Sequence, residues 1–169
     1  MVEPQDPQDG PRLSHLDAHG RARMVDVSAK PETERLAEAR ARIHLTPAVR
    51  SMVLRGDLPK GEALAVARVA GILAAKETGR LIPLCHPLGL DHVEVTFQPV
   101  GDASLEVRAL ARCRAATGVE MEALTAAAMA ALTVYDMCKA LCREARITDV
   151  ELLRKLGGKS GEWRREAAP

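Results

Sequence analysis

The chain has 169 residues, with 24 Lys and Arg against 23 Asp and Glu, so its formal net charge is only +1. It contains one Phe, one Tyr and one Trp, too few for a protein that stacks nucleotide bases on aromatic side chains. A hydrophobic fraction of 47% suits one domain with one core, and the balanced charge excludes the overall basic character of a duplex-binding protein.

The two ends of the chain differ in composition from the rest. Residues 1–12 are rich in Pro, Asp, Gln and Gly and lack the pattern of a signal peptide. We therefore expect a tail there, one α+β domain over residues 13–163 and a second tail at 164–169. No uncharged stretch reaches the roughly 20 residues of a membrane-spanning helix. Four cysteines at irregular spacing predict reduced thiols, and with them a cytoplasmic location.

The first half of the domain is predicted to contain strands followed by two helices. Residues 24–27 form a short stretch that can adopt β structure. Residues 36–45 alternate strictly between apolar and polar side chains, which favours a strand although their types favour a helix. Thr46-Pro47 is a good helix start, and Gly56 is expected to end that helix. A second helix, with small residues along one face, is predicted over residues 61–78.

The second half begins with a predicted hairpin. Residues 92–98 and 105–112 alternate as strands do, with a turn between them. Thr117 and Glu120 then match a capping box, in which a Thr side chain and a Glu three residues later cap each other's backbone amides. This motif predicts a helix that reaches about Cys142.

A last strand is predicted over residues 147–153. The elements then follow in the order strand, two helices, hairpin, long helix and strand. This order predicts an α+β fold, in which the helices pack on one face of an antiparallel sheet.

Asp136 is the most unusual charged residue of the long helix. Residues 123–135 before it carry no charge, which predicts burial on most sides of the helix. A carboxylate that enters such a helix needs a partner or a pocket. Lys139 lies one turn further on the same face. The spacing leaves two interpretations open: a structural ion pair where the helix leaves the core, or a functional pair.

His86 lies in a stiff segment, because prolines stand close on both sides of Cys85 and His86. Such a segment suits a positioned site residue, and the alternative is a buried turn with a hydrogen-bonded imidazole. Glu120 and Glu122 stand at the start of the long helix. They are candidates for acid/base catalysis or for binding a polar ring, although Glu120 also has the predicted capping role.

Two other kinds of site are rejected. Residues 157–161 read Gly-Gly-Lys-Ser-Gly, but Leu153 occupies the place of the first Gly of a Walker A motif and no long helix follows. Lys159 remains a candidate for contacts with phosphate. Cys138 and Cys142 lie one helical turn apart without a second pair of ligands, so no metal site is predicted.

Several segments of the chain closely resemble the molybdenum cofactor biosynthesis protein C family. They are residues 24–28, 81–88, 117–125, 133–140 and 157–161. The resemblance extends over nearly the whole chain, from about residue 13 to residue 163. It implies a ferredoxin-like α+β subunit that assembles as a homohexamer, a trimer of dimers, with active sites at the dimer interface.

The resemblance also implies the activity of the family, cyclic pyranopterin monophosphate synthesis. A cyclised dihydro-GTP is rearranged to the pyranopterin with release of pyrophosphate. The positions that match the family's catalytic residues are Asp136, Lys139, His86 and Lys60. Those that match its substrate-binding residues are Leu84, Cys85, His86, Glu120, Met121, Glu122, Arg35, Lys76, Lys155 and Lys159. No cofactor or protein-bound metal is expected, and magnesium would enter only with the substrate triphosphate.

This residue set suits that chemistry. Lys and Arg can stabilise the charge of the departing pyrophosphate, and His86, Lys139 and a carboxylate can transfer protons during ring opening and closure. A non-catalytic nucleotide-binding module is the alternative, but it would need cations rather than extra carboxylates. A metal-dependent phosphohydrolase would need a cluster of carboxylates and histidines that the sequence does not suggest.

Overall fold

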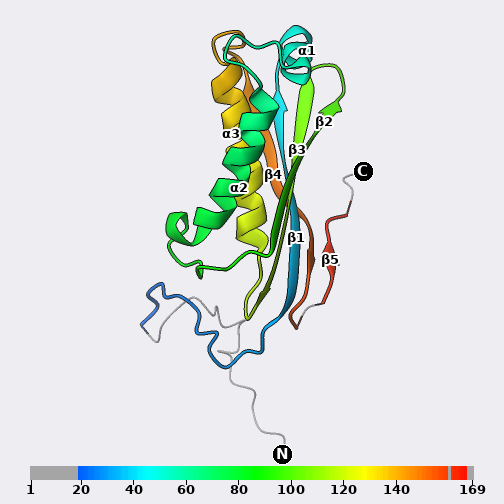
Figure 1. Cartoon of the computed structure of the whole chain (residues 1–169). Coiled ribbons are helices and arrows are strands. Elements are labelled where there is room, and N and C mark those ends of the chain that lie inside the picture. The colour runs from blue at the N-terminus through cyan, green and yellow to red at the C-terminus, as the bar shows by residue number, and fades with distance from the viewer. Residues whose placement is uncertain (1–18, 160, 167–169) are drawn as a thin grey trace, which may run out of the picture.

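The computed structural model describes residues 19–159 and 161–166, so the predicted tail at 1–12 and the last residues of the second tail lie outside it. Figure 1 shows the helices and strands of the described residues. They are β1 (Thr33–His44), α1 (Pro47–Arg55), α2 (Ala63–Leu81), β2 (His92–Val100), β3 (Ser104–Ala115), α3 (Glu120–Cys138), β4 (Arg146–Leu156) and β5 (Trp163–Arg164).

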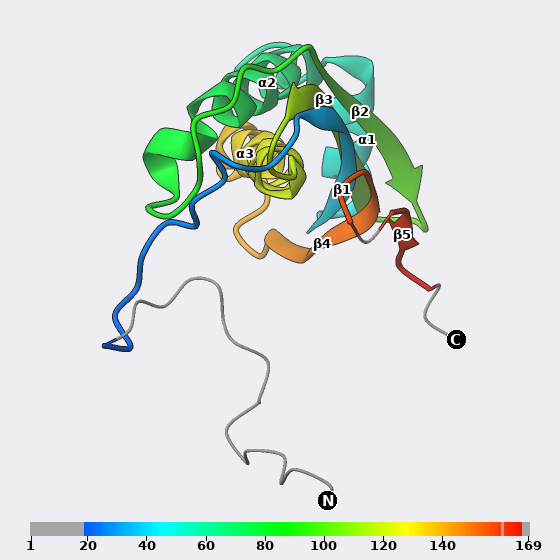
Figure 2. The ribbon, with the colours of Figure 1, turned by 90° about the horizontal axis from the view of Figure 1, so that it is seen from below.

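The strands form one antiparallel sheet in the order β2-β3-β1-β4-β5. The first four strands have the ferredoxin-like order, with β1 and β3 in the centre. Seen along the strands, α2 and α3 lie on one side of the sheet (Figure 2). The predicted α+β fold, with helices packed on one face of an antiparallel sheet, is confirmed.

Small side chains make the contact between sheet and helices close. The alternation that predicted β1 places Ala37, Ala39, Ala41 and Ile43 fully buried toward the helices. The facing side of α3 is buried through its own alanines. At Gly71 of α2, an added Cβ would lie 2.9 Å from a backbone oxygen of α3. The absence of a side chain there lets the two helices approach each other.

The ends of α1 are as predicted. The Oγ of Thr46 accepts a hydrogen bond from the backbone N–H of Val49 at 3.3 Å, and Pro47 occupies the first turn. Gly56 ends the helix with a left-handed φ of 74°, a conformation that glycine adopts without strain. The predicted hairpin is present as β2 and β3.

The predicted capping box of α3 is wrong. Val119 is the N-cap residue, and no side chain caps the helix. The carboxylate of Glu120 instead pairs with Lys155 on β4 at 3.1 Å, because a cation on the neighbouring strand competes for it. The helix also ends at Cys138, and Cys142 lies in the turn that follows.

Three smaller differences concern the edges of the predicted elements. Residues 24–27 do not form a strand, and the second helix continues to Leu81. The short strand β5 pairs with the end of β4 and crosses the predicted boundary between residue 163 of the domain and residue 164 of the tail. Among the described residues, the helices are too short or too polar to cross a membrane.

Candidate active site

Three charged side chains meet where α3 ends, and we call them the Asp136 cluster. The Asp136 carboxylate lies 2.7 Å from the Nζ of Lys139 and 3.2 Å from the Nζ of Lys60. Lys60 comes from the turn before α2, and its ammonium also donates to the backbone oxygen of Asp136 at 2.9 Å. The fold therefore brings together three of the four residues that the resemblance assigns to catalysis.

The two lysines determine the charge state of this cluster. Hydrogen bonds from Lys139 and Lys60 hold the pKa of Asp136 below its ordinary value. The same hydrogen bond with Asp136 raises the pKa of Lys139. At neutral pH the cluster thus presents one ionised carboxylate between two ammonium groups.

Residues 123–135 of α3 are buried or partly buried except for Leu132, whereas Asp136, which follows them, is exposed. The side chain of Asp136 is 58% exposed, and Leu132, one turn earlier, is 50% exposed. The reason is that α3 buries only the sides that face the sheet and α2. Exposed ion pairs contribute little to stability, so the cluster is not expected to stabilise the fold by much.

A second group of candidate residues surrounds the start of α3, and we call this region the Glu122 cleft. The cleft has a volume of about 270 Å³. Its lining includes Leu84, Cys85, His86, Glu120, Met121 and Glu122. These residues belong to two segments that the sequence separates, the stiff stretch after α2 and the first turn of α3.

Burial controls the protonation of the Glu122 cleft. Only 3% of Glu122 is exposed, and this burial raises the pKa of its carboxyl group, with a further contribution from the charge of Glu120. Burial and the charge of Glu122 also raise the pKa of the Cys85 thiol. A thiol that resists ionisation is a poor nucleophile, so Cys85 fits a role in binding.

A larger, cationic cleft of about 610 Å³ adjoins the Glu122 cleft. Its lining includes Arg35, Lys155 and Lys159, three residues that the resemblance assigns to substrate binding. The Nε of Arg35 donates to the backbone oxygen of Ala115 at 3.1 Å. A side chain at Gly158 would collide with the guanidinium of Arg35, so the glycine allows this loop to lie against it.

Lys30 lines both clefts, and the sequence reasoning missed it. Lys30 lies two positions beyond residues 24–28, one of the segments that resemble the family. This closeness in sequence was the only indication that Lys30 could belong to the site. Lys76, in contrast, lies exposed on α2 and lines neither cleft. Among residues 19–159 and 161–166, no three His, Cys, Asp or Glu side chains are grouped so that they could hold a metal ion.

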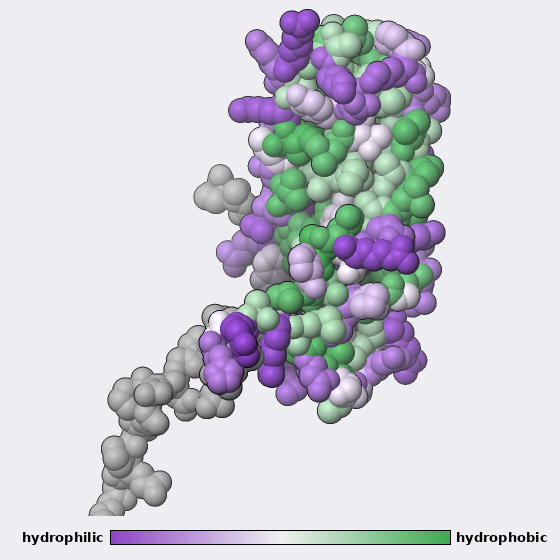
Figure 3. All heavy atoms as spheres, turned by 90° about the vertical axis from the view of Figure 1, so that its left-hand side faces the viewer, coloured by the Kyte–Doolittle hydropathy of each residue, from purple (hydrophilic) through white to green (hydrophobic). Residues whose placement is uncertain are grey.

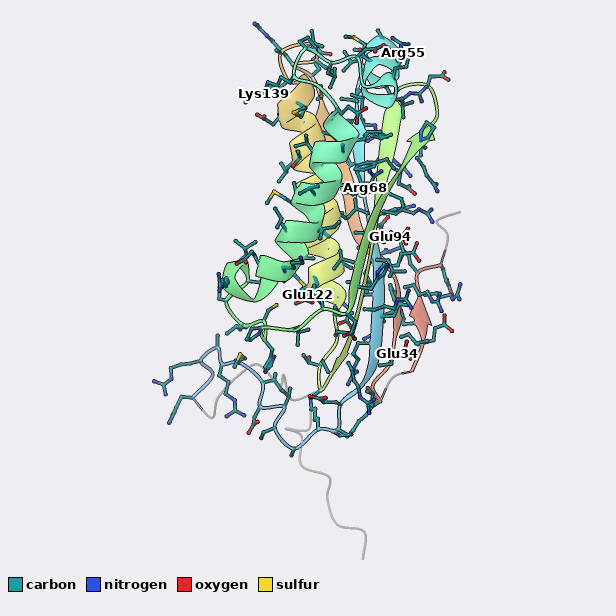
Figure 4. All side chains as sticks on the ribbon, in the orientation of Figure 1. Glu34, Arg55, Arg68, Glu94, Glu122 and Lys139 are labelled. Atoms are coloured by element: carbon teal, nitrogen blue, oxygen red, sulfur yellow. The ribbon has the colours of Figure 1, made fainter. Side chains whose placement is uncertain are left out.

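Within one chain, the Asp136 cluster and the Glu122 cleft lie far apart. Asp136 and Glu122 are almost four turns apart on α3, or about 21 Å along the helix axis. Lys139 and Glu122 lie toward opposite ends of this helix (Figure 4). His86 is therefore separated from the other three residues that the resemblance assigns to catalysis.

An apolar surface lies between the two ends, and we call it the helix-face patch. Val66, Val69 and Leu73 of α2 and Leu132 of α3 are each about half exposed. Hydrophobic side chains gather on this side of the molecule (Figure 3). Exposed apolar surface of this kind, bordered by charged residues, is typical of an interface with another protein.

Comparisons with known proteins agree with the resemblance. Residues 24–158 match the model of the MoaC family. The cyclic pyranopterin monophosphate synthase of Chloroflexus aggregans is 57% identical over 157 residues, covering 92% of this chain and 94% of the relative. That of Thermomicrobium roseum is 57% identical over 155 residues, covering 91% and 93%. Cyclic pyranopterin monophosphate synthase 3 of Mycobacterium tuberculosis is 54% identical over 156 residues, covering 92% and 88%. This chain belongs to the MoaC family.

Proposed function

We propose that this protein is a cyclic pyranopterin monophosphate synthase of molybdenum cofactor biosynthesis. Its substrate would be the cyclised dihydro-GTP, and its products cyclic pyranopterin monophosphate and pyrophosphate. Membership of the MoaC family and the names of the relatives support this proposal. The structural observation that carries it is the placement of the matching residues. All except Lys76 lie in the Asp136 cluster, the Glu122 cleft or the cationic cleft.

The proposal includes a site built from two copies of the chain. A two-fold axis through the helix-face patch would bury the patch and set the two α3 helices antiparallel. The Asp136 cluster of one copy would then meet the Glu122 cleft of the other. Lys76 lies one turn beyond Leu73 on α2, so it would also face the second copy. Three such dimers would form the homohexamer expected from the family resemblance.

The cationic cleft suits the triphosphate of the substrate. Arg35, Lys155, Lys159 and Lys30 carry positive charge around one hollow. They would hold the phosphates and stabilise the negative charge that develops as pyrophosphate leaves. Any magnesium would arrive with the triphosphate.

The remaining groups suit proton transfer at the ring. Asp136 stays ionised beside its two lysines and can accept a proton or a hydrogen bond. Lys139 stays charged and can stabilise an oxyanion. Glu122, whose pKa is raised by burial, is the carboxyl group best suited to deliver a proton.

We further propose that the enzyme works in the cytoplasm, where its thiols would stay reduced. Cys85, Cys113, Cys138 and Cys142 are all free. Burial raises the pKa of Cys113 to about 11 and that of Cys138 to about 11, so these two thiols resist oxidation.

Incubation with the purified cyclised dihydro-GTP tests the activity. We expect pyrophosphate and cyclic pyranopterin monophosphate to form in equal amounts, while plain GTP remains intact. Binding without pyrophosphate release would instead identify a nucleotide-binding module. Release of phosphate from plain GTP that depends on a divalent cation would identify a phosphohydrolase.

A further inference from the structure

We propose that the backbone carbonyl of Val25 fixes the tautomer of His86, so that Nδ1 is the nitrogen that exchanges protons in the Glu122 cleft. This inference deepens the proposed function, because it assumes that His86 transfers protons there. It gives residues 25–30, which we call the strap, the role of a positioning element.

The hydrogen bond between the two segments determines the tautomer. The Nε2 of His86 lies 2.8 Å from the backbone oxygen of Val25. A carbonyl oxygen only accepts hydrogen bonds, so Nε2 must carry the hydrogen. In the neutral imidazole the lone pair is then on Nδ1. The opposite tautomer would direct a lone pair of Nε2 at the carbonyl oxygen and lose this bond.

The strap is held in shape by its own side chains. The carboxylate of Asp26 accepts hydrogen bonds from the backbone N–H of Ser28 at 2.9 Å and from its hydroxyl at 2.7 Å. The backbone N–H of Lys30 donates to the oxygen of Val27 at 3.0 Å. Such an Asx turn stabilises the backbone of residues 26–28, which directly follow the carbonyl of Val25.

The strap also forms part of the cleft wall. Val25, Val27 and Lys30 line the Glu122 cleft together with His86. The titratable groups around the imidazole are Asp26 and Lys30 of the strap, Cys85 beside it, and Glu120 and Glu122 of α3. The hydrogen bonds with Ser28 hold the pKa of Asp26 below its ordinary value, so an anion stands close to an imidazolium when one forms.

A fixed tautomer has a chemical consequence for the reaction. Nδ1 can take a proton from the substrate and return it to another substrate atom, while the Nε2 hydrogen stays bonded to Val25. The proton gained and the proton given balance, and the ring need not rotate between the two steps. Such preorganisation is the usual function of a second residue bonded to a catalytic histidine.

NMR spectroscopy of the full oligomer labelled with nitrogen-15 histidine tests the inference directly, and the His86→Gln variant assigns the signals. In the neutral ring we expect a protonated Nε2 whose hydrogen exchanges slowly with water, and an unprotonated Nδ1. A proton on Nδ1, or a fast average of both tautomers, would overturn the inference. This readout does not depend on turnover, so its failure is distinguishable from failure of the synthase assay.

Variants of Asp26 distinguish the effect of the hydrogen bonds within the strap from the effect of the negative charge of Asp26. Asp26→Ala removes both bonds to Ser28, and we expect the Nε2 hydrogen to exchange about tenfold faster and kcat to fall by a similar factor. Asp26→Asn keeps the oxygen that accepts these bonds and should restore both values. If Asp26→Asn behaves like Asp26→Ala, the charge of Asp26 acts on His86 and the strap does not. Asp102→Ala, in the turn between β2 and β3, is the matched control.

Discussion

The two ends of α3 carry charged groups in opposite environments. At the C-terminal end, the Asp136 cluster pairs every charge, and its side chains are about half exposed. At the N-terminal end, Glu122 is buried, and its burial favours the neutral form. One end therefore holds an ionised carboxylate between cations, and the other holds a carboxyl group that binds its proton tightly.

This difference suggests a division of roles between the two ends. Ion pairs in water add little to stability, and burial of an ionisable carboxyl group opposes folding, so neither arrangement is expected to stabilise the chain by much. Groups whose environments push their pKa values apart are typical of acid/base sites. The two ends complement each other chemically although one chain keeps them about 21 Å apart.

The largest effect on turnover is expected when the charge of Asp136, at the exposed C-terminal end of α3, is removed. Asp136→Asn is nearly isosteric and should fold normally, while turnover should fall by about 100-fold or more because the ionised acceptor is lost. Asp57→Asn is the matched control, since Asp57 is similarly exposed and pairs with Arg55 at 2.6 Å. Steady-state kinetics of both variants with circular dichroism provide the measurement. Normal turnover in a folded Asp136→Asn protein would remove Asp136 from the site.

The next prediction concerns the helix-face patch, which lies between the two ends of α3, and its role in assembly. Leu73→Glu should dissociate the proposed oligomer and abolish most of the activity, because an unpaired carboxylate is costly to bury in an apolar contact. Val150→Glu, on β4, adds the same charge at a position that is 47% exposed and outside the helix-face patch. Sedimentation velocity separates the outcomes. An intact, active Leu73→Glu oligomer would show that this patch is not the interface.

The smallest expected effect is a pH dependence of the free energy of unfolding, caused by Glu122 at the buried N-terminal end of α3. Because folding raises the pKa of Glu122, the folded state binds its proton more tightly than the unfolded state. The stability that this carboxyl group contributes is complete below its unfolded pKa, near 4.5, and is lost as the pH rises through the folded pKa.

The permanently neutral Glu122→Gln variant should therefore gain stability over the parent protein above the folded pKa. The two should converge near pH 4.5, the ordinary value for glutamate. Denaturant titrations across this range measure the difference, with the exposed Glu144→Gln as the control for loss of a charge. A difference that does not change with pH would contradict the assigned environment of Glu122.

Local patterns in the sequence predicted the fold well. The alternation of residues 36–45 predicted β1, and Thr46-Pro47 and Gly56 predicted both ends of α1, because these signals act between neighbours in the chain. The capping box failed because Lys155, distant in sequence, competes for Glu120. The residues around the start of α3 do not by themselves predict that Glu120 pairs with Lys155.

The candidate site residues could be named from the sequence, but their arrangement in space could not. The i, i+3 spacing predicted the pair of Asp136 and Lys139, since Asp136 lies in the last turn of α3 and Lys139 is its C-cap residue. The contact of Lys60 with Asp136 joins residues 76 positions apart, and only the packing of α2 on α3 creates it. Lys30 was missed because an isolated lysine after a turn resembles any surface cation.

The proposed site built from two chains makes one prediction that a site within a single chain does not. Asp136→Asn and His86→Gln are each expected to be inactive alone. When equal amounts of both chains are assembled together, hybrid dimers contain one doubly substituted site and one intact site. Random assembly should then restore about a quarter of the wild-type activity, because half of the dimers are hybrids. Activity of the mixture that stays at the level of the two parent variants would contradict a site built from two chains.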